Sequence, residues 1–91
     1  MTMTADMEKL EALKLGTSAF KVLCYLSFKE APLKPSDIAS KIGEKPSTVR
    51  ARLAELKEAG LVKSTSSGYT SVLTPYDILM KLYRDIKSEK G

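Results

Sequence analysis

Residues 35–61 have the sequence PSDIASKIGEKPSTVRARLAELKEAGL, and this stretch decides the fold. It contains a short helical pattern that ends at Gly43, a tight turn, and a longer helical pattern that begins at Pro46. Two helices joined by a short glycine-containing turn are typical of a helix-turn-helix, whose second helix can lie in the major groove of DNA. We therefore predict a helix-turn-helix over residues 36–59.

The residues that follow this stretch have the pattern of a β-hairpin. Residues 61–65 and 69–73 are short runs rich in β-branched residues, and Ser66, Ser67 and Gly68 are predicted to form the turn between them. A helix-turn-helix followed by a hairpin is the winged-helix order. The sequence thus predicts a wing over 61–73 and an α+β, mostly α, winged helix-turn-helix.

Three further helices are predicted around this unit. An N-terminal helix over 4–15 would begin at Thr4 and end at Gly16, a core helix over 18–29 would be capped by Thr17, and a C-terminal helix over 75–88 would begin at Thr74-Pro75. Ser36 is predicted to cap the first helix of the helix-turn-helix. We expect one domain over residues 1–91, with more apolar surface on the terminal helices than one face needs.

Charge is concentrated on the helix-turn-helix and the start of the wing. The chain has a net charge of +4, and between Lys34 and Lys63 seven basic residues stand against four acidic ones, which accounts for most of it. Such a local excess is the electrostatic footprint expected of a nucleic-acid-binding surface. The acidic, polar start argues against a signal peptide and no apolar run is long enough to span a membrane, so a cytoplasmic protein is expected.

The residues that the chain lacks limit its chemistry. With no His and one Cys, neither a conventional zinc site nor a Ser/His or Cys/His catalytic pair can form, so we predict no enzyme activity and no cofactor. Cys24 is interpreted as a buried, inert thiol, with a redox switch or inter-subunit disulfide as the alternative. The lack of Asn and Gln beside plentiful Lys and Glu suggests a heat-adapted source.

Helical geometry assigns the outward face of the second helix. If Val49, Leu53 and Leu56 are buried, Ser47 and Ala51 lie opposite them. The alternative is that the arginines of this helix are ordinary solvated residues. The predicted DNA-contacting residues are Lys45, Ser47, Thr48, Arg50, Ala51, Arg52, Lys63, Ser66 and Ser67.

Different chemistry is expected from different members of this set. Thr48 and Ala51 can meet thymine methyl groups, Arg50 can reach guanine, and Arg52 is better placed for phosphate. Without Asn or Gln, base readout should be sparse, with shape and phosphate contacts carrying much of the binding. The wing tip can offer N–H groups and hydroxyls to phosphate, while Tyr69 either stacks on sugar or packs against the hairpin base.

Three stretches also resemble a known family. LKLGTSAFKVLCYL (13–26), PSDIASKIG (35–43) and PSTVRARLAELKEAGLV (46–62) are similar to prokaryotic winged-helix transcription regulators, nearest to the archaeal TrmB-like group, with the MarR and ArsR groups close by. The resemblance implies binding of double-stranded DNA and a homodimer formed by the terminal helices. The residues that it places at the dimer interface are Met7, Leu10, Tyr76, Leu79, Tyr83 and Ile86.

The chain also departs from these groups, and several functions remain open. It has no room for the large effector domain of TrmB-like regulators and lacks the Cys/His clusters of ArsR-type sensors, so no small-molecule effector is implied. A dimeric transcription regulator and a weakly specific, nucleoid-associated chromatin protein both fit the pattern. The alternative is a protein-interaction winged helix within a larger transcription or replication complex, which the weakly basic wing favours.

Overall fold

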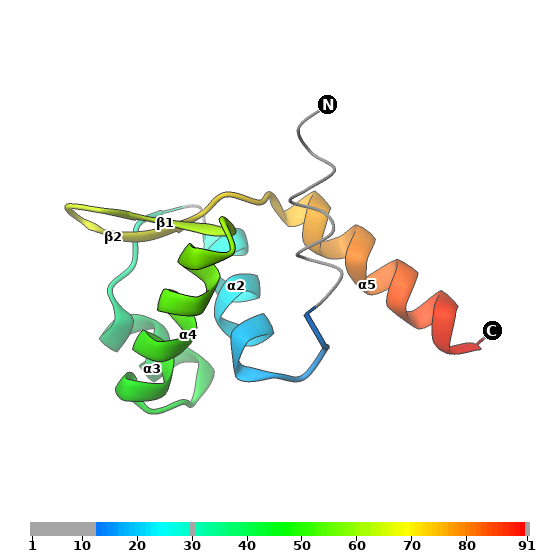
Figure 1. Cartoon of the computed structure of the whole chain (residues 1–91), viewed down its shortest axis with the longest axis horizontal. Coiled ribbons are helices and arrows are strands. Elements are labelled where there is room, and N and C mark those ends of the chain that lie inside the picture. The colour runs from blue at the N-terminus through cyan, green and yellow to red at the C-terminus, as the bar shows by residue number, and fades with distance from the viewer. Residues whose placement is uncertain (1–12, 30, 91) are drawn as a thin grey trace.

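The computed structural model describes residues 13–29 and 31–90, arranged around one central helix (Figure 1). The elements in chain order are α2 (Ser18–Lys29), α3 (Pro35–Ile42), α4 (Pro46–Glu58), β1 (Val62–Thr65), β2 (Gly68–Ser71) and α5 (Pro75–Lys90). α3 and α4 form the helix-turn-helix, the antiparallel hairpin β1–β2 forms the wing, and α5 projects toward the opposite end of the molecule. This architecture confirms the predicted fold class, a mostly helical α+β winged helix-turn-helix.

Helix α2 supplies the centre of the core because apolar residues cover more than one of its sides. Val22, Leu23 and Leu26 are at most 1% exposed. They belong to a cluster that includes residues of the other three described helices and of β1, namely Ile38, Ala39, Val49, Leu53, Leu56, Val62 and Ile78, with Leu61 and Leu73 from the connecting segments. The second apolar side of α2 is less uniform, since Phe20 is buried while Phe28 is 48% exposed. α2 therefore carries both the helix-turn-helix and the C-terminal helix.

The predicted N-terminal helix over 4–15 is wrong at its C-terminal end, just before α2. Residues 13–17 form a bend and a turn, so no helix extends over 13–15; positions 4–12 lie outside the described residues. This turn places Thr17 at the N-terminus of α2. The Thr17 hydroxyl accepts the Phe20 N–H at 3.2 Å and donates to the Lys14 carbonyl at 2.9 Å. Thr17 thus caps α2 as predicted, and Gly16 takes the positive φ of +86° that the turn requires.

The helix-turn-helix is built on the predicted apolar stripes, but one predicted cap is wrong. Ile38 and Ala39 of α3 are buried against Val49 and the other apolar residues of α4, and Gly43 ends α3 with a φ of +73°. Ser36 does not cap α3, because Pro35 occupies the first turn and moves the N-cap to Lys34. Proline is favoured at the first helical position, where its fixed φ fits and its missing N–H has no partner to lose.

The wing is attached to the segment that precedes α3. Val62 pairs with Ser71 and Thr65 with Gly68, and an isolated bridge joins Tyr69 to Leu33 through N···O distances of 2.8 and 3.0 Å. Gly68 is therefore the first residue of β2. The prediction that it belongs to the turn is wrong. Its φ is +142°, and a Cβ at this position would lie 2.5 Å from the Leu33 carbonyl oxygen. Only glycine allows this close approach.

Helix α5 begins with a reciprocal cap and has two dissimilar sides. The Thr74 N–H donates to the Asp77 carboxylate at 2.9 Å and the Asp77 N–H donates to the Thr74 hydroxyl at 3.3 Å. On its inner side Ile78 and Lys81 are fully buried, and the Lys81 ammonium donates to the Asp85 carboxylate at 2.9 Å. In the described parts of the chain, no helix combines the length and apolar character needed to cross a membrane.

Candidate nucleic-acid interface

The outward face of α4 carries most of the residues predicted to contact DNA. Burial of Val49, Leu53 and Leu56 leaves Ser47 and Ala51 exposed on the opposite side. Arg50 and Lys45 are exposed as well, while Thr48 is half-buried. Small side chains at the centre of this face let the helix backbone approach a surface closely, with cations at its margins.

The first turns of α3 and α4 share a feature that the sequence analysis missed. Each helix has a Lys-Pro-Ser start, in which the lysine is the N-cap and makes no side-chain capping hydrogen bond. The first helical bonds are donated by Ile38 to Lys34 at 3.1 Å and by Val49 to Lys45 at 3.0 Å. In each helix, the N–H groups between the N-cap lysine and this first donor therefore have no helical acceptor. They point out of the helix terminus, beside the lysine.

This open start distinguishes the helix-turn-helix from the other helices. Thr17 caps α2 and Thr74 caps α5, whereas neither α3 nor α4 has a side-chain cap, and α4 also lacks an acidic residue such as Asp37 in the first turn of α3. Free N–H groups and the helix dipole together favour an anion at such a terminus. Lys34 and Ser36 thus join the candidate site, and the repeated Lys-Pro-Ser was the sequence signal that could have identified them.

Arg52 differs from Arg50 because an acidic neighbour holds it. Its guanidinium makes two hydrogen bonds to the Glu55 carboxylate, at 2.9 and 2.6 Å, and its side chain is only 29% exposed. This bidentate geometry fixes the guanidinium along the flank of α4 that faces the start of α2. There it borders a hollow of about 450 Å³ whose other walls include Lys14, Thr17 and Ser18.

The wing contributes one cation and two exposed hydroxyl residues to the predicted set. Lys63 is exposed on β1, opposite Thr70 on β2, and Ser66 and Ser67 are exposed in the two-residue loop. Tyr69 is half-buried and packs against the core, which favours the packing interpretation over stacking on sugar. Figure 1 shows the wing tip and the first turns of α4 at the same end of the molecule, with the far end of α5 at the other.

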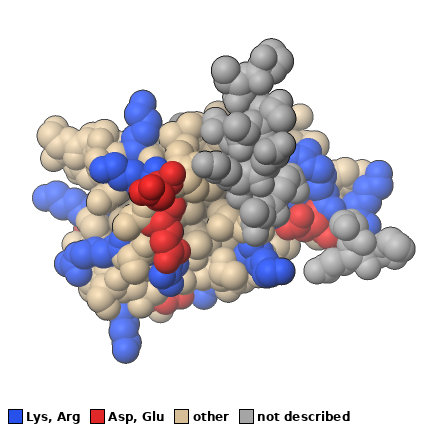
Figure 2. All heavy atoms as spheres, in the orientation of Figure 1, with Lys and Arg blue, Asp and Glu red and all other residues tan. Residues whose placement is uncertain are grey.

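The charge distribution agrees with this placement. In Figure 2, Lys and Arg side chains project along the edge of the molecule that holds α3 and α4, with acidic side chains mostly further in. Glu44 is partly neutralised by Lys21, whose ammonium lies 3.5 Å from its carboxylate. The outer edge of the helix-turn-helix therefore carries exposed cations, as does the α5 end of this face.

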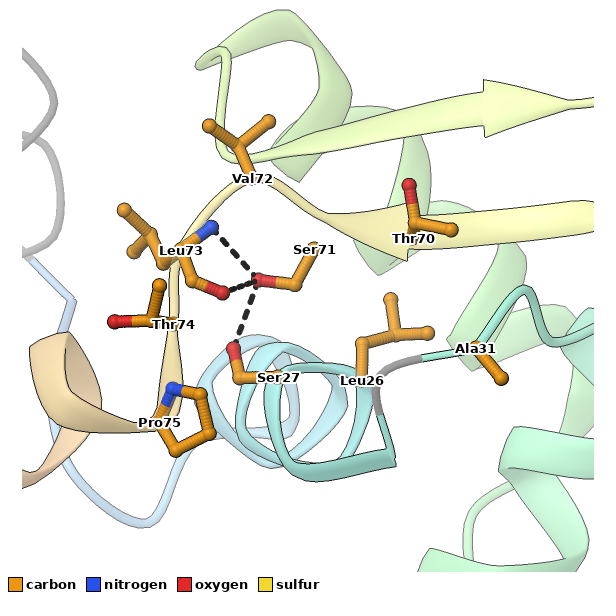
Figure 3. A pocket seen from close by; sticks show the side chains of 9 residues that line it. All are labelled: Leu26, Ser27, Ala31, Thr70, Ser71, Val72, Leu73, Thr74 and Pro75. Atoms are coloured by element: carbon orange, nitrogen blue, oxygen red, sulfur yellow. Dashed lines mark hydrogen bonds between the residues drawn. The ribbon is translucent and has the colours of Figure 1, made fainter.

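A second hollow lies away from the helix-turn-helix, where α2, β2 and the start of α5 meet (Figure 3). Its volume is about 300 Å³ and its walls are apolar and hydroxyl side chains without a charged residue. The Ser71 hydroxyl is the centre of a small network here, with Ser27 Oγ and the Leu73 carbonyl oxygen each at 2.8 Å and the Leu73 N–H at 3.0 Å. The network joins the end of α2 to the segment that leads into α5.

The remaining reactive group is the half-buried Cys24 thiol. Burial raises the pKa of Cys24 above its ordinary value. Among the described residues, no group of three or more His, Cys, Asp or Glu side chains is placed to hold a metal ion.

The residues predicted to form a dimer interface are placed differently from the DNA-contacting set. Tyr76, Leu79, Tyr83 and Ile86 lie along the outer side of α5 and are 54–68% exposed. Met7 and Leu10 fall outside the described residues. The four aromatic and aliphatic side chains recur at intervals of three and four residues, which places them on one stripe of the helix.

Comparison with known families identifies the helix-turn-helix and the first wing strand. Residues 18–64, just over half of the chain, match the family described as bacterial regulatory protein, arsR family. This chain belongs to the arsR family. The match includes α2, α3, α4 and most of β1, and it confirms the predicted membership of a winged helix-turn-helix regulator family. Members of the arsR family are DNA-binding transcription regulators and in general not enzymes. No curated protein matches the chain.

Proposed function

We propose that this arsR-family chain binds double-stranded DNA with residues 46–59, which are α4 and its C-cap, in the major groove and with residues 63–69 of the wing near the backbone or minor groove. The observation that carries this proposal is the open N-terminus of α4. Its free N–H groups lie beside exposed Lys45, Ser47 and Arg50, with no acidic residue in the first turn. Recognition helices contact DNA mainly through their N-terminal residues.

The proposed contacts fall into two groups. Lys45, the α4 N-terminus, Arg52, Lys63, Ser66 and Ser67 are assigned to the phosphate backbone. Arg50, Thr48, Ser47 and Ala51 are assigned to base edges, with Arg50 as the reader of guanine. Because Arg50 is an exposed cation of this face, its loss should affect binding more than that of any neutral neighbour.

The test is fluorescence anisotropy with a labelled random-sequence duplex across a salt series. We expect Arg50→Ala to weaken binding by about 1 kcal/mol or more and to make the salt dependence shallower by about one unit of slope. Lys29→Ala is the matched control, since it also removes one positive charge but lies in the last turn of α2, outside the helix-turn-helix and the wing. Absence of wild-type binding at low salt, or equal effects of the two substitutions, would contradict the proposal.

We also propose that the protein acts as a homodimer through the outer stripe of α5. Ile78 and Lys81 commit the inner side of this helix to its own subunit, which leaves Tyr76, Leu79, Tyr83 and Ile86 for a partner. Spacings of three and four residues are those of a helix-pair seam, and exposed apolar patches mark interaction sites. A second copy would place two recognition helices about one DNA turn, roughly 34 Å, apart on a pseudo-palindromic site.

Sedimentation equilibrium tests the dimer directly. Leu79→Glu should shift the protein to monomer, because two charges would be buried at the centre of the seam. Ser40→Glu on the exposed side of α3 introduces the same charge elsewhere and should leave the association unchanged. A wild-type monomer at tens of micromolar, or equal effects of both variants, would argue against this interface.

Two roles on DNA remain to be separated by specificity. A transcription regulator favours its site over random DNA by a factor of about 10³ or more, whereas a chromatin-type, nucleoid-associated protein does not. Competition of selected genomic fragments against random duplex gives this ratio. The alternative from another class, a protein-interaction module, is favoured by the wing, where Lys63 is the single basic residue over 61–73. It requires that wild-type protein show no salt-dependent DNA binding.

A further inference from the structure

Thr65 closes the wing through its side chain. Its hydroxyl accepts the Ser67 N–H at 3.1 Å and donates to the Gly68 carbonyl at 2.9 Å. One bond reaches the second loop residue and the other crosses the two-residue loop to Gly68, with which Thr65 is also paired in the strand register. One side chain thus ties together both ends of the loop, although it lies on an exposed part of the hairpin.

The sequence of the loop explains why such a brace is needed. Two-residue hairpin loops are usually Asn-Gly, Asp-Gly or another pair with a glycine, because the favoured turns need positive φ angles. Here the loop residues are Ser66 and Ser67, and the nearest glycine, Gly68, is used for the contact with Leu33. The Thr65 hydroxyl supplies hydrogen bonds that hold a loop of unfavourable composition.

The wing is anchored on the side of β2, close to its tip: Tyr69 pairs with Ser64, one register position from the pair that closes the loop. Tyr69 and Leu33 exchange backbone hydrogen bonds, and Leu33 directly precedes Lys34, the N-cap of α3. With the start of β2 anchored beside α3, the conformation of the two-residue loop determines where the hydroxyls of Ser66 and Ser67 point. Within the described residues, neither the Ser66 nor the Ser67 hydroxyl has an intramolecular hydrogen-bond partner.

We propose that Thr65 is a positioning residue for DNA binding, which holds Ser66 and Ser67 so that their hydroxyls meet the phosphate backbone. This inference rests on the proposed function. Since the Ser67 N–H is donated to Thr65, the tip contacts DNA through its side chains and not through that amide. The role is one of orientation, because the Thr65 hydroxyl has its own partners inside the loop.

Two substitutions of Thr65 separate the brace from strand propensity without changing the charge of the protein. Thr65→Val keeps the β-branched shape favoured in strands but removes the hydroxyl, whereas Thr65→Ser keeps the hydroxyl and lowers the propensity. If the brace matters, Thr65→Val weakens DNA binding by about 2- to 10-fold, the range of a net hydrogen-bond contribution, and Thr65→Ser binds like the wild type. If only propensity matters, the order is reversed.

A second measurement needs no DNA. Amide hydrogen exchange of Ser67, followed by NMR, should be about 2- to 10-fold faster in Thr65→Val than in the wild type and unchanged in Thr65→Ser. Its result stands whether or not the protein binds DNA, so it separates failure of the brace from failure of the proposed function.

A double-mutant cycle completes the test. In a Ser66→Ala/Ser67→Ala background, adding Thr65→Val should have no further effect on DNA affinity, because the hydroxyls that it positions are gone. Wild-type affinity of Thr65→Val would overturn the inference even if Arg50→Ala showed that α4 binds DNA. An undiminished effect of Thr65→Val in the alanine background would overturn it too, and absence of any wild-type DNA binding would remove both this inference and the proposed function.

Discussion

The hydroxyl oxygens of Ser27 and Ser71 lie 2.8 Å apart, and this contact joins the end of α2 to the strand that leads into α5. Ser27 Oγ also lies 2.8 Å from the Leu23 carbonyl oxygen, while Ser71 Oγ accepts the Leu73 N–H and lies 2.8 Å from the Leu73 carbonyl oxygen, so that the two hydroxyl protons are shared among three contacts. The two residues are unequal members of one network. Ser71 holds the turn before α5, and Ser27 fixes that turn to the core.

Substitution of the two serines should therefore have unequal effects on stability. Ser71→Ala leaves the N–H of buried Leu73 without its acceptor and should lower the free energy of unfolding by about 1–3 kcal/mol. Ser27→Ala leaves the Ser71–Leu73 bonds intact and should cost about 0.5–1.5 kcal/mol. Urea unfolding followed by circular dichroism measures both. Equal losses would show that the turn before α5 does not depend on Ser71.

A methyl group at position 68 should disrupt the wing. Gly68→Ala places a Cβ 2.5 Å from the Leu33 carbonyl oxygen at a φ of +142°, so that β2 must move away from the segment before α3. Gly16→Ala is the control, because its φ is also positive, at +86°, but nothing lies within 4 Å of the added carbon. We expect roughly 1–2 kcal/mol for the control from backbone strain alone and a clearly larger loss for Gly68→Ala. Thermal melts of the two variants decide the order.

The two arginines of α4 should differ in their contribution to DNA binding. Arg50 is exposed, whereas Arg52 is held by Glu55, so Arg52→Ala should reduce affinity less than Arg50→Ala. Glu55→Gln weakens the hold on Arg52 and removes a negative charge near the proposed phosphate surface, so it should tighten binding and steepen the salt dependence. Anisotropy titrations at two salt concentrations test this order. A tighter complex with Arg52→Ala than with the wild type would be incompatible with it.

Cys24 should be slow to react and should affect stability only at alkaline pH. Because burial raises its pKa, the thiol of the folded protein keeps its proton at pH values where the unfolded thiol, near 9.0, loses it. Unfolding then releases a proton, so stability falls as the pH rises from about 9 through the folded pKa. The difference in unfolding free energy between wild type and Cys24→Ala should be constant below about pH 8 and shrink above it. Rapid alkylation of the folded protein by iodoacetamide at pH 7 would contradict the raised pKa of this half-buried thiol.

The sequence was sufficient for those features that depend on local chemistry. The stripe of Val49, Leu53 and Leu56, the Thr17 cap and the Thr74-Asp77 start of α5 all follow from spacing and side-chain type, and the structure has each of them. The repeated Lys-Pro-Ser is equally local, but its significance is the absence of a side-chain cap, which residue type alone does not indicate.

The features that the sequence could not provide depend on partners distant along the chain. Glycine is common in turns, which is why the sequence predicts Gly68 there. Its actual position is set by contact with Leu33, which precedes the helix-turn-helix in the chain. Similarly, nothing in the sequence shows that Ser71 would meet Ser27. Arg52 is an intermediate case, since pairing with Glu55 was one of several arrangements that the helical spacing allowed.

The backbone bridge between Leu33 and Tyr69 has a consequence for the order in which the protein folds. A two-stranded hairpin is marginally stable by itself in water, and this one gains its third pairing from a residue that precedes α3. That pairing can form only once α3 and α4 have brought the two ends of their segment together. Formation of the wing is therefore expected to complete the folding of the helix-turn-helix, so that the two are gained and lost in one cooperative step.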